Sequence, residues 1–229
     1  MCKKLHFFLI IVLAFGGLSA CTKHQISPIL TDTSCEPPCW HGIVPGNTTK
    51  DDLISILDSL PIVNRSSIHE GDQWSVFDER VFFSLATGER AFASILDGKV
   101  KVLMFTKSPT TNLGITLQDV IDRYGAPETV LNDGVPMAGR GLLIDYPQKG
   151  ISLDLGSIEN RWIEFLFIRP KIGPRSKVIT IRFFDPKDYE WTYEWLHKNE
   201  YAQDYLDARH KWAGYGNIEA KYPVPEINH

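Results

Sequence analysis

The sequence lacks the local signatures of the common catalytic and nucleotide-binding sites. It contains no Gly-x-Ser-x-Gly, no His-Glu-x-x-His, no Walker phosphate-binding loop and no dinucleotide-binding glycine fingerprint. No block of like charges stands out, and 24 basic residues against 28 acidic ones give a net charge of −4. This balance disfavours a nucleic-acid partner. The histidines show no metal-ligand spacing, so the sequence predicts neither a metal nor a cofactor, and catalysis is not the favoured function.

Long hydrophobic runs are also missing. The uncharged apolar run Phe7–Phe15 is shorter than the roughly 20 residues that an ordinary membrane-spanning helix needs. Lys3 and Lys4 precede this run and small residues follow it as far as Ala20, which is the layout of a secretory signal. Removing residues 1–20 from the 229 leaves a mature chain of 209 residues, with 22 basic and 28 acidic side chains and a net charge of −6.

The last residues of this signal, Leu18-Ser19-Ala20-Cys21, resemble the lipobox of bacterial lipoprotein precursors. The resemblance implies that the Cys21 thiolate receives a diacylglyceryl group and that a peptidase cuts between Ala20 and Cys21. Two acyl chains hold a protein stably on a membrane, whereas one holds it only marginally. We therefore expect a palmitate-type lipid anchor on the extracytoplasmic side of the cell membrane or outer membrane. The open alternative is a secreted protein with a chance cysteine after the cut.

Cysteine is scarce, with four residues in the whole chain. Cys2 lies in the signal and Cys21 is expected to carry lipid, so Cys35 and Cys39 remain. One pair in an exported protein favours a disulfide, and the short loop that it closes predicts modest stabilisation. A zinc site made by these thiols with His41 is the alternative, but no second ligand pair has matching spacing.

Two segments of the body repeat one pattern. Thr49–Ile54 and Thr116–Ile121 each begin with Thr, have Asp three residues later and then two apolar residues. This is a variant of the capping box and predicts the start of a helix in each place, with proline near each helix end. Runs rich in β-branched and aromatic residues follow both helices. They predict strands at residues 73–77, 81–86, 91–96, 100–106, 128–131, 141–146, 150–155, 161–168 and 178–184.

This order of elements predicts an α+β fold with two similar units. Each unit is a short helix followed by antiparallel strands, the helices pack on one sheet face, and a C-terminal helical segment follows. The expected divisions are a lipoprotein signal peptide (1–20), a lipidated tether with the cysteine pair (21–40), a first helix-plus-sheet unit (41–108), a second such unit (109–185) and a C-terminal helical, aromatic-rich segment (186–229).

The stretch Gly42–Thr49 (GIVPGNTT), followed by an acidic and apolar helix, resembles the opening of SmpA/BamE-like envelope lipoprotein domains. The second copy keeps Gly114-Ile115-Thr116 and Gly125-Ala126-Pro127 but lacks the Pro-Gly turn. The tandem layout is also similar to beta-lactamase-inhibitor-like proteins. Both resemblances imply a protein-binding or assembly role without catalysis. The Cys-x-x-x-Cys-Trp segment departs from both families, so no specific partner is carried over.

Two further sets of residues are candidates for binding or chemistry. Trp191, Trp195 and Trp212 lie in the C-terminal segment and could form an aromatic platform for a sugar, lipid headgroup or peptide. The favoured interpretation is that these rings bury their area against the sheet. Asp145 and Asp154 fall on adjoining predicted strands, where an acid–base pair is conceivable and solvation on a polar face is favoured.

The sequence thus predicts a membrane-anchored envelope lipoprotein, held through Cys21, that acts as a protein-interaction or assembly module. Its expected partners are the membrane and an unidentified envelope protein, and no nucleic acid is expected. The alternative function is an envelope hydrolase on a degenerate scaffold.

Overall fold

The computed structural model describes residues 27–71, 79–107, 112–132, 142–156, 171–192 and 202–225. The expected signal peptide, Cys21 and Trp195 lie outside the described residues, as do the strands predicted at 73–77 and 161–168. Within the described residues, no helix is both long enough and apolar enough to cross a membrane.

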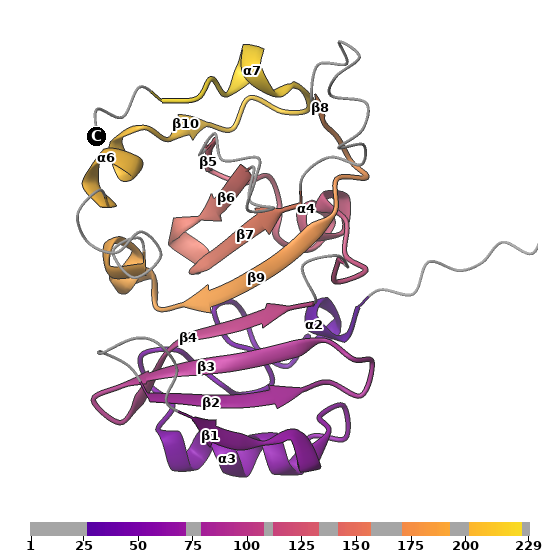
Figure 1. The fold of residues 1–229 in the computed structure, drawn as a ribbon, viewed down its shortest axis with the longest axis vertical. Helices are drawn as coiled ribbons and strands as arrows, with labels where there is room; N and C mark the ends of the chain where they lie inside the picture. The colour runs from indigo at the N-terminus through magenta and orange to yellow at the C-terminus, as the bar shows by residue number, and fades with distance from the viewer. Residues whose placement is uncertain are drawn as a thin grey trace, which may run out of the picture.

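One antiparallel sheet runs through the described part of the molecule (Figure 1). Its nine described strands follow the order β1-β2-β3-β4-β9-β7-β6-β5-β10, from the bottom of Figure 1 to the top, and β8 pairs separately with β11. The strands are β1 (His69–Gly71), β2 (Glu79–Ser84), β3 (Arg90–Leu96), β4 (Lys99–Thr106), β5 (Thr129–Leu131), β6 (Leu142–Tyr146), β7 (Ile151–Leu155), β8 (Lys171–Ile172), β9 (Val178–Phe184), β10 (His210–Lys211) and β11 (Gly216–Asn217).

The predicted fold of two similar units, each a short helix followed by its own antiparallel strands, is wrong. Strands β4 and β9 pair from Val102 opposite Phe184 to Thr106 opposite Thr180, and this pairing joins the strands of both predicted units into one nine-stranded sheet. The expected C-terminal helical segment is also wrong, because it contains strands as well as helices: β10 pairs with β5 and β11 with β8. Pairing between strands far apart in sequence has no local sequence pattern, so the repeat alone could not exclude a continuous sheet.

The described helices are short. They are α2 (Pro28–Thr31), α3 (Lys50–Ser59), α4 (Leu117–Tyr124), α6 (Ala202–Asp207) and α7 (Ile218–Lys221), with 3-10 turns at Arg65–Ser67, Pro147–Lys149 and Pro186–Asp188. The two predicted caps are present, because the Thr49 and Thr116 hydroxyls each accept a hydrogen bond from the backbone N–H three residues later. Caps of this kind satisfy N–H groups that a helix start otherwise leaves unpaired.

Alternation along the strands gives the sheet two different faces. The first face, which includes Val81, Phe105 and Ile181, is apolar and forms the main core together with buried residues of α2, α3 and α4. The second face carries the alternate residues of the same strands. Across β4, β9, β7 and β6 its row runs Met104, Arg182, Ser152 and Asp145, which lie opposite one another in register.

The C-terminal segment, yellow at the top of Figure 1, wraps around the β5 edge of the sheet. On the second face, Leu206 of α6 packs against Leu131 and Leu143. Beyond β10, Trp212 and Tyr222 pack with the main core of the first face. One stretch of chain therefore covers parts of both faces, with β10 as the crossing point.

Candidate functional site

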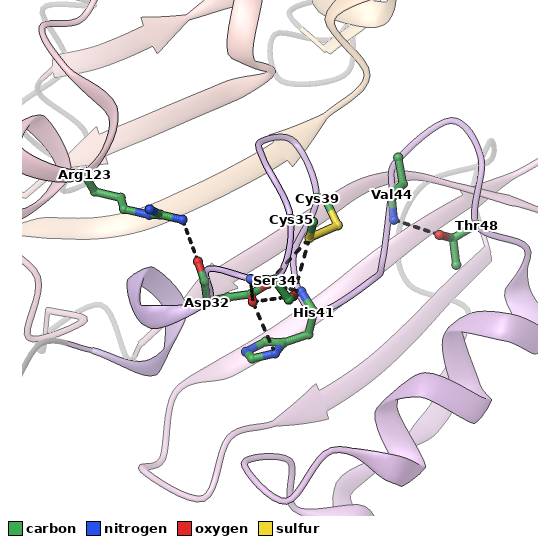
Figure 2. Close-up of a disulfide and its surroundings, with 8 residues drawn as sticks. All are labelled: Asp32, Ser34, Cys35, Cys39, His41, Val44, Thr48 and Arg123. Carbon is green, nitrogen blue, oxygen red and sulfur yellow. Dashed lines mark hydrogen bonds and ion pairs between the residues drawn. A yellow bond between two sulfur atoms is a disulfide. The ribbon is translucent and has the colours of Figure 1, made fainter.

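The predicted disulfide is confirmed: Cys35 and Cys39 are bonded, with their Cα atoms 5.7 Å apart (Figure 2). Disulfide sulfurs are not thiolates, so the alternative of a zinc site on these residues finds no support. The chain before the disulfide, expected to be part of the tether, is already packed. Ile29 and Leu30 are 1% and 4% exposed and belong to the main core.

Asp32 organises the region around the disulfide, as Figure 2 shows. Its carboxylate accepts hydrogen bonds from the backbone N–H of Ser34 at 2.8 Å, from the Ser34 hydroxyl at 2.6 Å and from the backbone N–H of His41. Its backbone carbonyl accepts a bond from Arg123 of α4 at 2.6 Å. Burial acts to raise the pKa of Asp32, but the bonds from Ser34 and His41 outweigh it and hold the pKa below its ordinary value. The Asp32 carboxylate therefore stabilises the turn around the disulfide, and its backbone carbonyl links this turn to α4.

A carboxylate–imidazole pair lies beside this loop. His41 Nδ1 is 3.8 Å from Asp32 Oδ1, and the His41 ring stands edge-on to buried Trp40 at 4.7 Å. His41 adopts a left-handed backbone conformation with φ of 47°. Such a pair could move a proton, but the Ser34 hydroxyl beside it donates its proton to the Asp32 carboxylate. Among the described residues, the contacts of this pair stabilise a turn and do not activate the Ser34 hydroxyl as a nucleophile.

A buried ion pair occupies the second face between β7 and β9. Arg182 Nη1 donates to Asp154 Oδ1 at 2.9 Å, and Arg182 Nη2 donates to the other oxygen, Oδ2. The two side chains are 2% and 7% exposed. Both oxygens of the Asp154 carboxylate are therefore engaged in a bidentate pair with the guanidinium, the strong geometry for an arginine–carboxylate contact.

Asp145 is also buried, on β6, and accepts a hydrogen bond from the Tyr189 hydroxyl at 3.1 Å. Arg209 donates to the same hydroxyl and lies over the Tyr189 ring, 4.9 Å from its centre. These contacts tie the C-terminal segment to the second face. Asp145 and Asp154 are therefore not the solvated surface residues that the sequence favoured. Both hold the fold together.

The aromatic residues singled out in the C-terminal segment do not form one platform in the described structure. Trp191 lies beside β4, with the Lys101 ammonium 5.8 Å from its ring. Trp212 directly follows the edge strand β10; it stacks on Tyr222 at 6.1 Å and an interplanar angle of 17°, and packs against the main core. Trp195 lies outside the described residues. Of these three residues, Trp212 packs against the sheet, as the favoured interpretation expects.

Sequence reasoning missed a row of rings on the second face of β1–β3. His69 stacks on Phe82 at 5.3 Å, Phe82 lies 5.8 Å from Phe92, and the Arg80 guanidinium lies 4.8 Å above the Phe92 ring. His69 is exposed, and Phe82 and Phe92 are half-buried. The alternation in β2 contained the signal, because a period of two places Phe82 on the face opposite buried Val81.

No cluster of three or more metal-ligating side chains occurs within the part of the chain that the structure describes. No family model matches the sequence, and no curated protein sequence matches it.

Two solved structures show a limited similarity to this chain. One is a cysteine-rich secretory protein from Staphylococcus aureus, with 14% identity over 68% of this chain and 49% of that chain and a TM-score of 0.34. The other is an extracellular protein containing an SCP domain from Bacillus anthracis, with 11% identity over 72% of this chain and 49% of that chain and a TM-score of 0.34. This chain thus spans about half the length of each. Similarity at this level assigns neither a family nor a function.

Proposed function

We propose that this chain is a lipid-anchored, extracytoplasmic protein-interaction module that presents the second face of β1–β4 to a partner protein. The observation that supports this proposal is the row of neighbouring rings formed by His69, Phe82 and Phe92. These rings are exposed or half-buried on a sheet whose other face already supplies the main core. Aromatic residues, Met and Arg are enriched in the centres of protein interfaces, and all three occur here.

The short distance in sequence between Cys21 and the first described residue, Ser27, supports a body held close to the membrane. Cys21 and Ser27 are six residues apart, so the chain between them spans at most about 20 Å. A lipid on Cys21 holds the folded body within that distance of the membrane surface. The Cys35–Cys39 disulfide supports an extracytoplasmic location, because disulfides persist in oxidising compartments.

The hydrolase alternative has less support from the described residues. The two carboxylates that sequence reasoning offered as an acid–base pair are both engaged, Asp154 with Arg182 and Asp145 with Tyr189. The described cysteines form a disulfide, and the hydroxyl of Ser34 is bonded to a carboxylate. General acid–base or nucleophilic catalysis requires groups that are free to exchange a proton.

Photo-crosslinking in intact membranes tests the interaction face. A photo-reactive amino acid replaces exposed His69 in the ring row, and in a matched control it replaces exposed Asp122 on α4, which packs on the first face. We expect a discrete protein adduct from position 69, weakened by Phe82→Ala, and none from position 122. No adduct from position 69, or equal adducts from both positions, would overturn the proposed interaction face.

The lipid anchor has a separate test. Cys21→Ser should leave the precursor uncleaved and abolish incorporation of labelled fatty acid, because serine supplies no thiolate. Labelling that persists in Cys21→Ser would show that the lipobox interpretation is incorrect.

A further inference from the structure

A short basic segment connects β8 to β9. Residues 171–177 (KIGPRSK) contain Lys171, Arg175 and Lys177 and no acidic residue. Lys171 and Arg175 are exposed, and Lys177 is half-buried. The whole chain carries a net charge of −4, so this segment runs against the overall composition. The segment 171–177, the basic loop, is therefore a local concentration of positive charge.

Backbone hydrogen bonds hold the basic loop against the first turn of α4. The N–H of Leu117 donates to the carbonyl of Ser176 at 2.8 Å, and the N–H of Gln118 donates to the carbonyl of Pro174 at 3.0 Å. A helix leaves the N–H groups of its first turn without partners inside the helix, so the loop satisfies two of them. The loop is therefore fixed in position at the start of α4.

Two aromatic side chains lie beside the basic loop. Gly216 of β11 is opposite Ile172 of β8, so Tyr215, one residue earlier, lies next to the loop. The Tyr215 hydroxyl donates to the Gln118 side chain at 2.9 Å, and Trp212 stands edge-on to the Tyr215 ring at 5.7 Å. Both rings are half-buried. Side chains with an apolar body and a polar tip suit the boundary between lipid headgroups and water.

Positive charge predominates around these rings, although acids are also present. Asp119 belongs to the cap of α4, and Asp122 accepts a hydrogen bond from the Gln118 side chain at 2.7 Å. Burial and the Asp122 charge both raise the pKa of Tyr215, so Asp122 lies near this ring. Residues 211–221, which carry both rings, contain two lysines and one acid, Glu219. Together with the basic loop, this side of the molecule favours an anionic partner.

The start of the described chain lies on the same side. Arg123 in the last turn of α4 donates to the backbone carbonyl of Asp32, directly after α2, at 2.6 Å. Figure 1 shows α2, α4 and β8 together on the right of the molecule. An α-helix of eight residues is about 12 Å long, so α4 separates α2 from the basic loop by little more than that. Cys21 is six residues before Ser27, and a membrane that holds Cys21 is therefore within reach of the loop.

We infer that the basic loop, with Trp212 and Tyr215, docks on the anionic headgroups of the membrane that holds the chain. This inference rests on the proposed lipid anchor and specifies which side of the body faces the membrane. Lys171 and Arg175 contact headgroup phosphates, and the two rings lie at the level of the headgroups. A few basic residues bind an anionic surface only weakly on their own, so the loop orients a body that lipid already holds.

A chemical tether tests the docking independently of lipid attachment in cells. The whole mature chain, residues 21–229, is coupled through the Cys21 thiol to a maleimide lipid in vesicles. Cys35 and Cys39 do not react, because they form a disulfide. The vesicles consist of phosphatidylcholine alone or of phosphatidylcholine mixed with phosphatidylglycerol. An amine-reactive reagent then labels the protein, and mass spectrometry gives the labelling rate of each lysine.

Docking should protect the lysines of the basic loop. We expect Lys171 and Lys177 to be labelled at least about threefold more slowly on phosphatidylglycerol vesicles than on phosphatidylcholine vesicles, because the docked amines are covered. Lys99 and Lys187 are exposed controls, since Lys99 begins β4 and Lys187 follows β9, at the opposite ends of these strands from the loop. Their labelling should be the same on both vesicles. Added salt should remove the protection, because it screens the charges.

A matched pair of variants assigns the docking to this loop. Arg175→Glu with Lys177→Glu should return the labelling of Lys171 on phosphatidylglycerol vesicles to its rate on phosphatidylcholine. Lys99→Glu with Lys187→Glu makes the same change in net charge and should leave Lys171 protected. Thermal unfolding of both variants checks that each is folded.

Three results would overturn the inference: equal labelling of Lys171 on the two kinds of vesicle, equal slowing at Lys99 and Lys187, or loss of protection in both double variants. Fatty-acid labelling that persists in Cys21→Ser would instead remove the proposed anchor, and with it the cellular role of this surface. Absence of protection in a chain whose Cys21 carries lipid in cells would remove the docking alone.

Discussion

Arg182 on β9 holds Asp154 on β7 by both carboxylate oxygens, inside the sheet and almost completely out of solvent. The register places Arg182 opposite Ser152, two residues before Asp154, so the pair runs diagonally across neighbouring strands. Burying two charges is costly, and a pair repays this cost only with good geometry. Two parallel bonds supply that geometry, and they also pin the register of β7 against β9.

Breaking this pair from one side should be severe. Asp154→Ala leaves the Arg182 charge buried without its partner, and we expect a loss of about 3–5 kcal/mol in the free energy of unfolding. Replacing both residues by apolar ones, Asp154→Leu with Arg182→Met, should cost clearly less than Asp154→Ala. Urea unfolding of the three proteins measures this order. A double variant as unstable as Asp154→Ala would show that the pair contributes more than mutual neutralisation.

The disulfide should contribute moderately to stability. Replacing both cysteines, Cys35→Ser with Cys39→Ser, should lower the free energy of unfolding by about 2 kcal/mol, because the loop that they close is short. Reduction of the wild-type protein should lower its stability by a similar amount and should not affect the double variant. A loss near zero would mean that the Asp32 hydrogen bonds alone hold this turn.

Asp32 should make stability depend on pH in the acid range. Its pKa in the folded chain lies below the ordinary value of 3.8, so its contribution is fully present above that value and is lost as pH falls through the folded pKa. Asp32→Asn removes this contribution. In urea unfolding, the stability difference between wild type and Asp32→Asn should be constant above about pH 5 and shrink below about pH 4. A difference that grows towards acid pH would contradict the sign of the shift.

Features set by a few neighbouring residues could be predicted from the sequence. The caps at Thr49 and Thr116 and the Cys35–Cys39 disulfide each depend on residues within four positions of one another. The strand predicted at 178–184 coincides with β9, because alternation and β-branched residues act locally. These parts of the fold required no knowledge of the rest of the chain.

Features that depend on distant pairing could not be predicted. The β4–β9 contact joins Leu103 to Phe183, and both ends of it look like ordinary strand residues. The Asp154–Arg182 pair and the Phe82–Phe92 contact arise only once the register is set, which local sequence does not specify. Local alternation places Phe82 on the face opposite Val81, but only the β2–β3 register brings Phe92 beside it, and the candidate interaction face was missed for this reason.

The two helix caps differ in a backbone hydrogen bond made by the acidic residue. Asp52 and Asp119 each accept a bond from the capping threonine hydroxyl at 2.7 Å. Asp119 also accepts a bond from the Thr116 backbone N–H at 2.7 Å, which completes a capping box. Both acids sit in the first turn, so each gains similarly from the helix dipole.

Asp119→Ala should therefore destabilise the protein more than Asp52→Ala, because it also leaves a backbone N–H without its acceptor. Thr49→Ala and Thr116→Ala should each cost about 0.5–2 kcal/mol. Urea unfolding at neutral pH measures all four variants. If Asp52→Ala costs as much as Asp119→Ala, the reciprocal bond adds nothing to the cap, and the dipole accounts for both acids.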